Sequence, residues 1–178
     1  MKRLNVLAVL AVLCMSSLSY AQFAGTGTTT LAVTVGSEAA IRIDTASTAL
    51  TASGTTFANP YSGTTNFTYK VRTTKVGGSG TITLKVTTDF SGSGGPSVAT
   101  PPAGDSLSYT CSVGGVGTPG PTPVNASTSS STNCVTFGAD AKSAFGGDAG
   151  SVAWSLTNDP AYSTGSYNAT VTFTVSAV

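Results

Sequence analysis

Apolar and polar residues alternate with a period of two along most of this chain, which predicts β-strands throughout. In the first half such runs occupy residues 28–35, 38–44, 66–73 and 81–88. In the second half they occupy residues 107–113, 134–138, 151–157 and 165–178. No stretch repeats its apolar residues at helical spacing, so the pattern predicts an all-β protein of about eight strands.

Clusters of Gly, Pro, Asn and Ser separate the runs, as expected for turns between short strands. One face of each strand is apolar and the other is rich in Thr, a pattern that favours a single immunoglobulin-like antiparallel β-sandwich. A closed barrel is the alternative architecture. The glycines of residues 75–80 can adopt positive φ, so the runs on either side are predicted to pair as an antiparallel hairpin.

The first 21 residues have the layout of a secretory signal peptide. Lys2 and Arg3 form a basic start, residues 4–15 an apolar stretch, and residues 19–21 a small-x-small cleavage site. About a dozen apolar residues are too few to span a bilayer as a helix. We therefore expect an exported mature chain, residues 22–178, with no membrane span. It would be secreted or lie on the surface of a bacterium after cleavage near Ala21.

Charged residues make up 8 % of the chain, whereas about 25 % is usual. Without Lys2 and Arg3, six basic residues remain against seven acidic ones, so nucleic acid is not expected as a partner. The surface must then consist mainly of Thr, Ser, Asn and Gly. Such a surface has few of the charges that keep strand edges apart.

Cys111 and Cys134 are the two cysteines of the expected mature chain. An even number of cysteines in an exported protein predicts a disulfide between them. Closing a loop of this size contributes on the order of 3 kcal/mol by constraining the unfolded chain. The enclosed segment is rich in Gly, Pro and Ser, so the bridge is expected to hold a long loop in place.

The expected mature chain shows no catalytic pattern. It has no histidine, the commonest general base and transition-metal ligand. Its aspartates are scattered singly near turn residues, whereas a glycosidase needs two carboxylates across a cleft. Asp140 and Asp148 share a glycine-rich stretch but lack the spacing of a calcium loop. We therefore expect no enzyme activity, no metal site and no cofactor.

Three tyrosines are candidates for glycan contact, because flat aromatic faces on a neutral, hydroxyl-rich surface suit sugars. Tyr61 and Tyr162 lie just after a turn proline, and Tyr167 lies at the start of the last run. The competing interpretation is that these rings cap the corners of a sandwich and are half buried. Trp154 alternates with Val152 and Leu156, so we expect it in the core.

The stretch GSYNATVTFTV, residues 165–175, resembles the ending of exported β-sandwich subunits of the spore-coat-U and chaperone–usher pilin type. The matching positions are Gly165, Tyr167, Val171, Phe173 and Val175. Residues 28–43 are similar to the start of such subunits, where an alternating arm precedes the first domain strand. The resemblance implies a pilin-like subunit. Those families often carry a cysteine near the first strand, whereas here both cysteines lie in the second half.

A second resemblance is carried by Trp154-Ser155-Leu156, which is similar to the Trp-x-Leu motif of WxL cell-wall domains. One copy is present here, where that family usually has two. Wall binding is what this resemblance implies.

Residues 165–178 contain no charge and no proline. A strand of this kind templates other chains when its edge is open, so it must be covered within its own domain or paired with another subunit. Residues 27–35 alternate, and Gly36-Ser37 can act as a hinge. Residues 22–37 are therefore either the first strand of the sandwich or an N-terminal arm, and residues 38–178 form the domain.

The leading hypothesis is an exported structural subunit of a bacterial surface filament or pilus-like fibre, which self-assembles into a homopolymer by β-strand exchange. The donor strand would use Leu31, Val33 and Val35, and the partner strand would use Val171, Phe173 and Val175. Head-to-tail insertion does not close on itself, so it generates a filament. The alternative is a monomeric secreted or wall-associated sandwich that binds glycans.

Overall fold

The computed structural model describes residues 28–102 and 104–178, which contain nine strands and no helix. The strands are β1 (Glu38–Ile43), β2 (Tyr61–Arg72), β3 (Gly80–Thr88), β4 (Leu107–Val113), β5 (Thr118–Pro119), β6 (Val124–Asn125), β7 (Thr132–Phe137), β8 (Asp148–Leu156) and β9 (Thr170–Ala177). The predicted signal peptide, residues 1–21, lies outside the described residues. Within those residues, no helix has the length and apolar character needed to cross a membrane.

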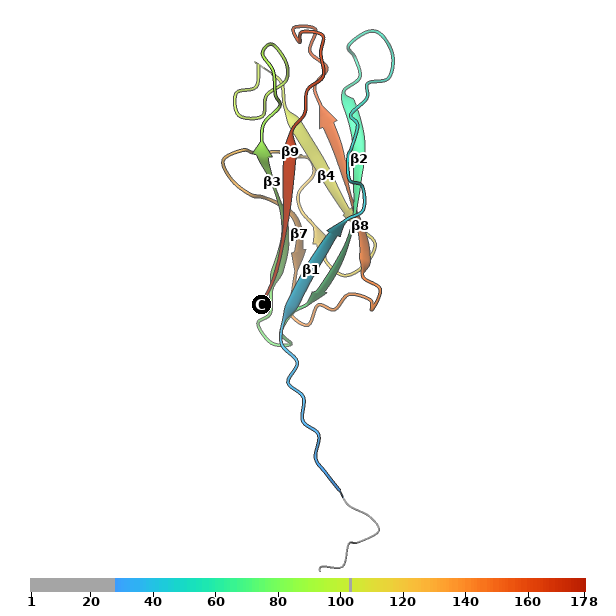
Figure 1. The fold of residues 1–178 in the computed structure, drawn as a ribbon, viewed down its shortest axis with the longest axis vertical. Helices are drawn as coiled ribbons and strands as arrows, with labels where there is room; N and C mark the ends of the chain where they lie inside the picture. Colours follow the sequence, from blue (N-terminus) through green and yellow to red (C-terminus); the bar gives the residue numbers. More distant parts are fainter. Residues whose placement is uncertain (1–27, 103) are drawn as a thin grey trace, which may run out of the picture. The chain divides into compact units, whose positions relative to one another are not determined.

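The strands form two antiparallel sheets that pack face to face (Figure 1). The five-stranded sheet has the order β1-β2-β8-β4-β6, and the four-stranded sheet has the order β5-β7-β3-β9. The prediction of an all-β sandwich is confirmed. Since each strand sends alternate side chains inward, the period-two pattern of the sequence becomes one core between the sheets.

The core consists of the inward residues of both sheets. Trp154 packs against Tyr109 with ring centroids 5.4 Å apart, and its indole N–H donates a hydrogen bond of 2.9 Å to the Thr65 hydroxyl. The fully buried side chains include Phe67 and Tyr69 of β2, Ile82, Leu84 and Val86 of β3, and Val152 of β8. Trp154 therefore lies in the core, as predicted.

The predicted hairpin between residues 66–73 and 81–88 is wrong. β2 and β3 belong to different sheets, so residues 73–79 connect one layer to the other. Thr73 anchors this connection: its buried hydroxyl donates to the Gly138 carbonyl over 2.7 Å and accepts the Ala141 N–H over 2.8 Å. Glycines allow a tight hairpin and a crossover equally well, so the local sequence does not decide between them.

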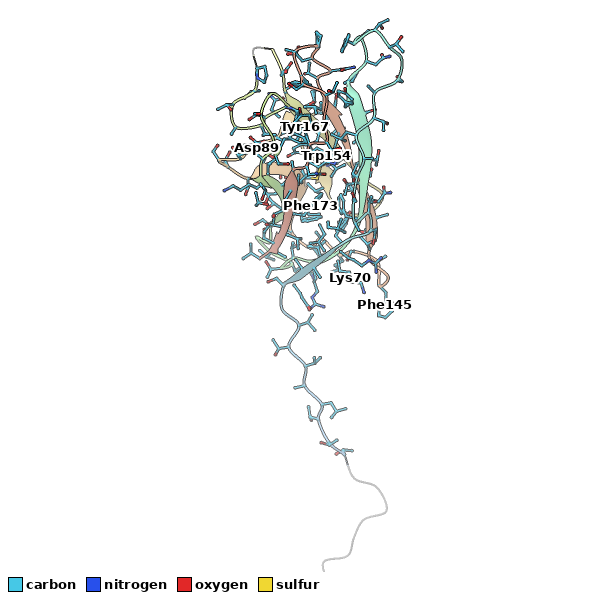
Figure 2. The ribbon with its side chains drawn as sticks, turned by 45° about the horizontal axis from the view of Figure 1, so that its top comes forward. Lys70, Asp89, Phe145, Trp154, Tyr167 and Phe173 are labelled. Atoms are coloured by element: carbon cyan, nitrogen blue, oxygen red, sulfur yellow. A yellow bond between two sulfur atoms is a disulfide. The ribbon has the colours of Figure 1, made fainter. Side chains whose placement is uncertain are left out.

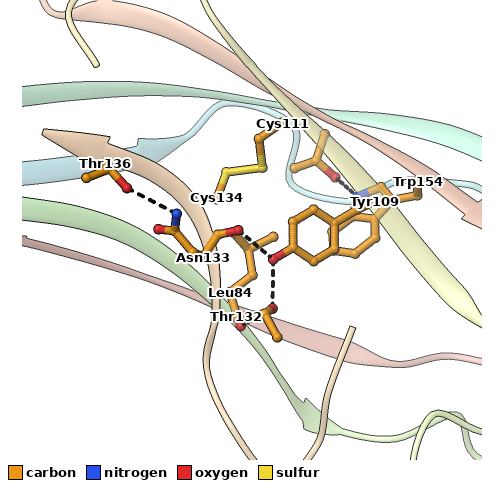
Figure 3. Close-up of a disulfide and its surroundings, with 9 residues drawn as sticks. Leu84, Tyr109, Cys111, Thr132, Asn133, Cys134, Thr136 and Trp154 are labelled. Carbon is orange, nitrogen blue, oxygen red and sulfur yellow. Dashed lines mark hydrogen bonds between the residues drawn. A yellow bond between two sulfur atoms is a disulfide. The ribbon is translucent and has the colours of Figure 1, made fainter. Parts of the chain in front are cut away.

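The predicted disulfide is present. Cys111 of β4 and Cys134 of β7 are bonded, with Cα atoms 5.5 Å apart, and the bond joins the two sheets through the core (Figure 3). Tyr109 lies beside it and donates its hydroxyl to the Thr132 hydroxyl over 2.7 Å. The enclosed segment includes β5 and β6, two strands of two residues each that the sequence pattern did not predict.

Candidate functional site: the free edge of β9

The sandwich has two sides at which both sheets end, and they are built differently. On one side the terminal strands are β5 and β6, near the disulfide. On the other side, here called the open side, the terminal strands are β1 and β9, which lie close to each other. β5 and β6 are very short, and Pro119, Pro121 and Pro123 lie in or between them. Short strands and prolines prevent edge pairing, so only the open side is available to another strand.

The ladder between β3 and β9 determines which backbone groups of β9 face away from β3. Val178 and Ser79 exchange two backbone hydrogen bonds, 2.8 Å from Val178 N to Ser79 O and 3.3 Å in return. In an antiparallel ladder, such pairs alternate with pairs that exchange none. The register continues without a shift from Gly80↔Ala177 to Val86↔Val171. The residues whose N–H and C=O groups point to the free edge are therefore Val171, Phe173, Val175 and Ala177.

These same four residues also point their side chains toward the core, where they remain only half buried. The inward residues of the neighbouring strand, Ile82, Leu84 and Val86, are fully buried. Phe173 lies 5.9 Å from Phe67 between ring centroids, so its ring packs against the core although it is only half buried. The core is thus complete under β3 and incomplete under β9.

β1 contributes the other boundary of the open side. Its inward residues Ala39 and Ile41 are half buried against the core. Its outer residues carry charges that form exposed ion pairs: Arg42 with Asp44 at 2.6 Å, and Glu38 with Arg72 of β2 at 3.0 Å. Such charges protect an edge strand. β9 has none, and this makes it the more accessible of the two edges for β-strand addition.

The predicted donor residues are exposed. Leu31, Val33 and Val35 are 91 %, 87 % and 62 % exposed, although large aliphatic side chains are usually buried. Residues 28–37 belong to no strand. The described part of the arm, residues 28–37, is therefore no strand itself, and its alternating apolar side chains are exposed.

The three predicted glycan-contact tyrosines are half buried. The Tyr162 hydroxyl donates to the Asp105 carboxylate over 2.6 Å, and burial, followed by that hydrogen bond and the nearby negative charges, raises its pKa. The ring of Tyr167 lies so close to Gly95 that a Cβ there would be 2.1 Å from its Cε1 atom. Tyr61 starts β2 and packs against the core. Each tyrosine supports its own loops, and glycan contact stays a prediction.

The loop after β3 is organised by Asp89. Its carboxylate accepts the N–H groups of Phe90, Val98 and Ala99 and the hydroxyl of Ser97, at 2.8 to 3.0 Å. Partial burial raises the pKa of this carboxyl, but the four hydrogen bonds outweigh it and hold the pKa below its ordinary value. Asp89 is therefore a structural residue of this loop.

No protein-family model, curated protein or solved structure matches the chain. The function must therefore be inferred from the geometry of the open side. Sequence reasoning identified β9 as unprotected but could not place it at a sheet edge, because strand order is a property of the tertiary structure. It also indicated an alternating run at residues 38–44, but it could not show that the strand formed there, β1, borders the same opening.

Proposed function

We propose that this protein is an exported structural subunit of a bacterial surface filament, and that its copies join by β-strand exchange. The observation that supports this most strongly is the free edge of β9. Its outward N–H and C=O groups and its half-buried side chains belong to the same residues, Val171, Phe173 and Val175. One incoming strand would satisfy both the hydrogen bonds and the core.

The donor in this proposal is the arm of a second copy. Its residues Leu31, Val33 and Val35 repeat with the same two-residue spacing as the inward residues of β9. When Val33 lies opposite Phe173, the centres of the two sets coincide. Antiparallel pairing is the more stable arrangement, and each copy would then give one strand and accept one, so that the chain of copies grows without closing.

The remaining features agree with a structural, exported protein. The disulfide between the sheets is of the kind that persists in oxidising compartments. The sequence contains no histidine, and the aspartates of the described loops mainly accept local hydrogen bonds, as Asp89 does. We infer that the protein is not an enzyme, and that its assembly is its activity.

Electron microscopy of the purified mature protein tests the proposal. We expect filaments from the intact chain and none after deletion of residues 22–36. Replacing Thr34 with Ala is the matched control, because Thr34 alternates with the apolar donor residues and should face away from the core. A full-length protein that stays monomeric at high concentration would refute the proposed function.

The register can be tested by cross-linking. With Val33 opposite Phe173 in an antiparallel pair, Thr34 lies opposite Thr172, in a position that exchanges no hydrogen bond and brings the Cα atoms to about 4.5 Å. That Cα spacing is within the range of a disulfide. We expect the Thr34→Cys/Thr172→Cys variant to form covalent multimers. If the donor strand ran parallel to β9, Thr34 would instead lie opposite Thr174. Multimers from Thr34→Cys/Thr174→Cys and none from Thr34→Cys/Thr172→Cys would therefore indicate a parallel strand.

A further inference from the structure

The two ends of the sandwich differ in charge. Figure 2 shows Lys70 and Phe145 near one end, and Asp89 and Tyr167 near the other. The first, here called the basic end, carries Lys70, Arg72, Lys75 and Lys142. The second, here called the acidic end, is formed by residues 89–102, 104–106 and 157–169, whose sequences contain Asp89, Asp105 and Asp159 and no Lys or Arg.

The basic end combines charge with exposed apolar side chains. Phe145 is 99 % exposed, and the Lys70 ammonium lies 5.5 Å from the centre of its ring. Val76, in the loop after β2, is exposed as well. Lys142 forms an exposed ion pair with Asp140 at 2.7 Å. The side chains of this end are four basic ones and three acidic ones, Glu38, Asp140 and Asp148, so they sum to a net positive charge of one.

The acidic end is held together by bonds between its two loops. Ser163 N donates to the Gly94 carbonyl over 2.7 Å, and Ser91 N donates to the Asn168 carbonyl over 3.1 Å. The Tyr162 hydroxyl also reaches Asp105 across the two loops. The three carboxylates are therefore carried on one ordered surface.

We propose that the basic end of one subunit packs on the acidic end of the next subunit in the fibre; this rests on the proposed function. Charge complementarity favours a second copy as the occupant, since opposite ends attract each other and acidic ends repel each other. The same contact fixes the direction of the exchanged strand. The chain enters β1 at the basic end, where Arg72 donates to the Gly36 carbonyl over 2.7 Å.

An arm that leaves the basic end of one copy would then reach the acidic end of its neighbour first. β9 begins at that end, with Thr170, and finishes beside Ser79. The N-terminus of the entering arm is farthest from its own domain, so the arm would run from the basic end of the neighbour toward its acidic end. β9 runs in the opposite direction, and the two strands would therefore be antiparallel. The end contact and the preferred pairing of the free edge lead to the same arrangement.

The test compares two substitutions with equal charge change in the mature protein. Lys75→Glu reverses a charge at the basic end, whereas Lys85→Glu reverses one on the outward face of β3. At about 20 mM salt we expect Lys75→Glu to slow filament elongation about ten-fold, a size of effect that charge steering allows. Near 1 M salt, where charges are screened within about 3 Å, the elongation rate of the variant should approach that of the unaltered protein. Filaments of Lys85→Glu should elongate at a rate within about two-fold of the unaltered protein, because this charge lies away from the basic end and contributes little to charge steering there.

The outcomes are distinguishable. If the unaltered protein forms no filament, the proposed function fails and the end contact fails with it. If it forms filaments and Lys75→Glu elongates as fast at low salt, only the end contact is wrong. If Lys75→Glu elongates normally but no longer binds vesicles containing phosphatidylglycerol, the basic end faces a membrane instead. Because Lys75 is exposed, the thermal unfolding midpoint of Lys75→Glu should equal that of the unaltered protein. An equal midpoint would show that the variant is folded.

Discussion

Leu31→Ala should weaken filaments without weakening the subunit. Leu31 is 91 % exposed in the single chain, so shortening it removes no contact within its own domain. In the proposed fibre the side chain would be buried beside β9. The substitution deletes three carbon atoms, and at about 0.8 kcal/mol for each buried carbon this amounts to about 2 kcal/mol per joint. That energy corresponds to a factor of about 30 in an equilibrium constant.

The measurement is the critical monomer concentration, obtained by pelleting filaments and assaying the supernatant. We expect it to rise about 30-fold for Leu31→Ala and to change little for Thr34→Ala. Thermal unfolding of the monomer should be the same for both. Equal effects of the two substitutions on filament formation would refute the alternating donor face, and a lower unfolding midpoint for Leu31→Ala would show that Leu31 packs on its own domain.

Three further predictions concern the stability of the sandwich. Replacing Cys111 and Cys134 with Ala should lower the free energy of unfolding by about 3 kcal/mol in urea titrations, because the closed loop spans 23 residues. Gly150→Ala should cost about 1–3 kcal/mol, because its Cβ would lie 2.3 Å from Phe67 Cζ. Since the folded pKa of Asp89 is lowered, its stabilising effect is present above the unfolded pKa of about 3.9 and is lost as the pH falls through the folded pKa. Asp89→Asn should therefore lose less stability than the parent between pH 7 and pH 3.

Each of these has a clear counter-result. Unfolding curves of the cysteine variant that overlay those of the oxidised protein would exclude the loop contribution. Gly146→Ala is the control for Gly150, because nothing lies within 4 Å of its Cβ position; equal losses at both sites would exclude the clash with Phe67. An unchanged acid response in Asp89→Asn would mean that other carboxyl groups govern unfolding below pH 4.

Much of the core could be read from the sequence because side-chain direction in a strand has a period of two. In the run of residues 66–73, alternation predicts one apolar face, and its residues Phe67, Tyr69 and Val71 are all buried. Ile82, Leu84 and Val86 behave in the same way. The alternation of side-chain direction depends only on local backbone geometry, so it does not depend on the order of the strands in the sheets.

Pairing depends on more than local geometry, and there the sequence was less informative. β2 and β3 are consecutive and joined by a glycine-rich loop, yet they lie in different sheets. β5 and β6 are too short to alternate. The candidate site illustrates the same limit: the absence of charge in β9 is visible in the sequence, but its position at a sheet edge depends on how all nine described strands are ordered.

The disulfide has a mechanical consequence in the proposed fibre. Tension would enter a subunit through β1, at the edge of one sheet, and leave through β9, at the edge of the other. The pull would therefore shear the two layers past each other, and packed apolar side chains resist sliding weakly. The bond from Cys111 to Cys134 joins those layers covalently, so an oxidised fibre should bear a steady load that a reduced fibre would relieve by creep.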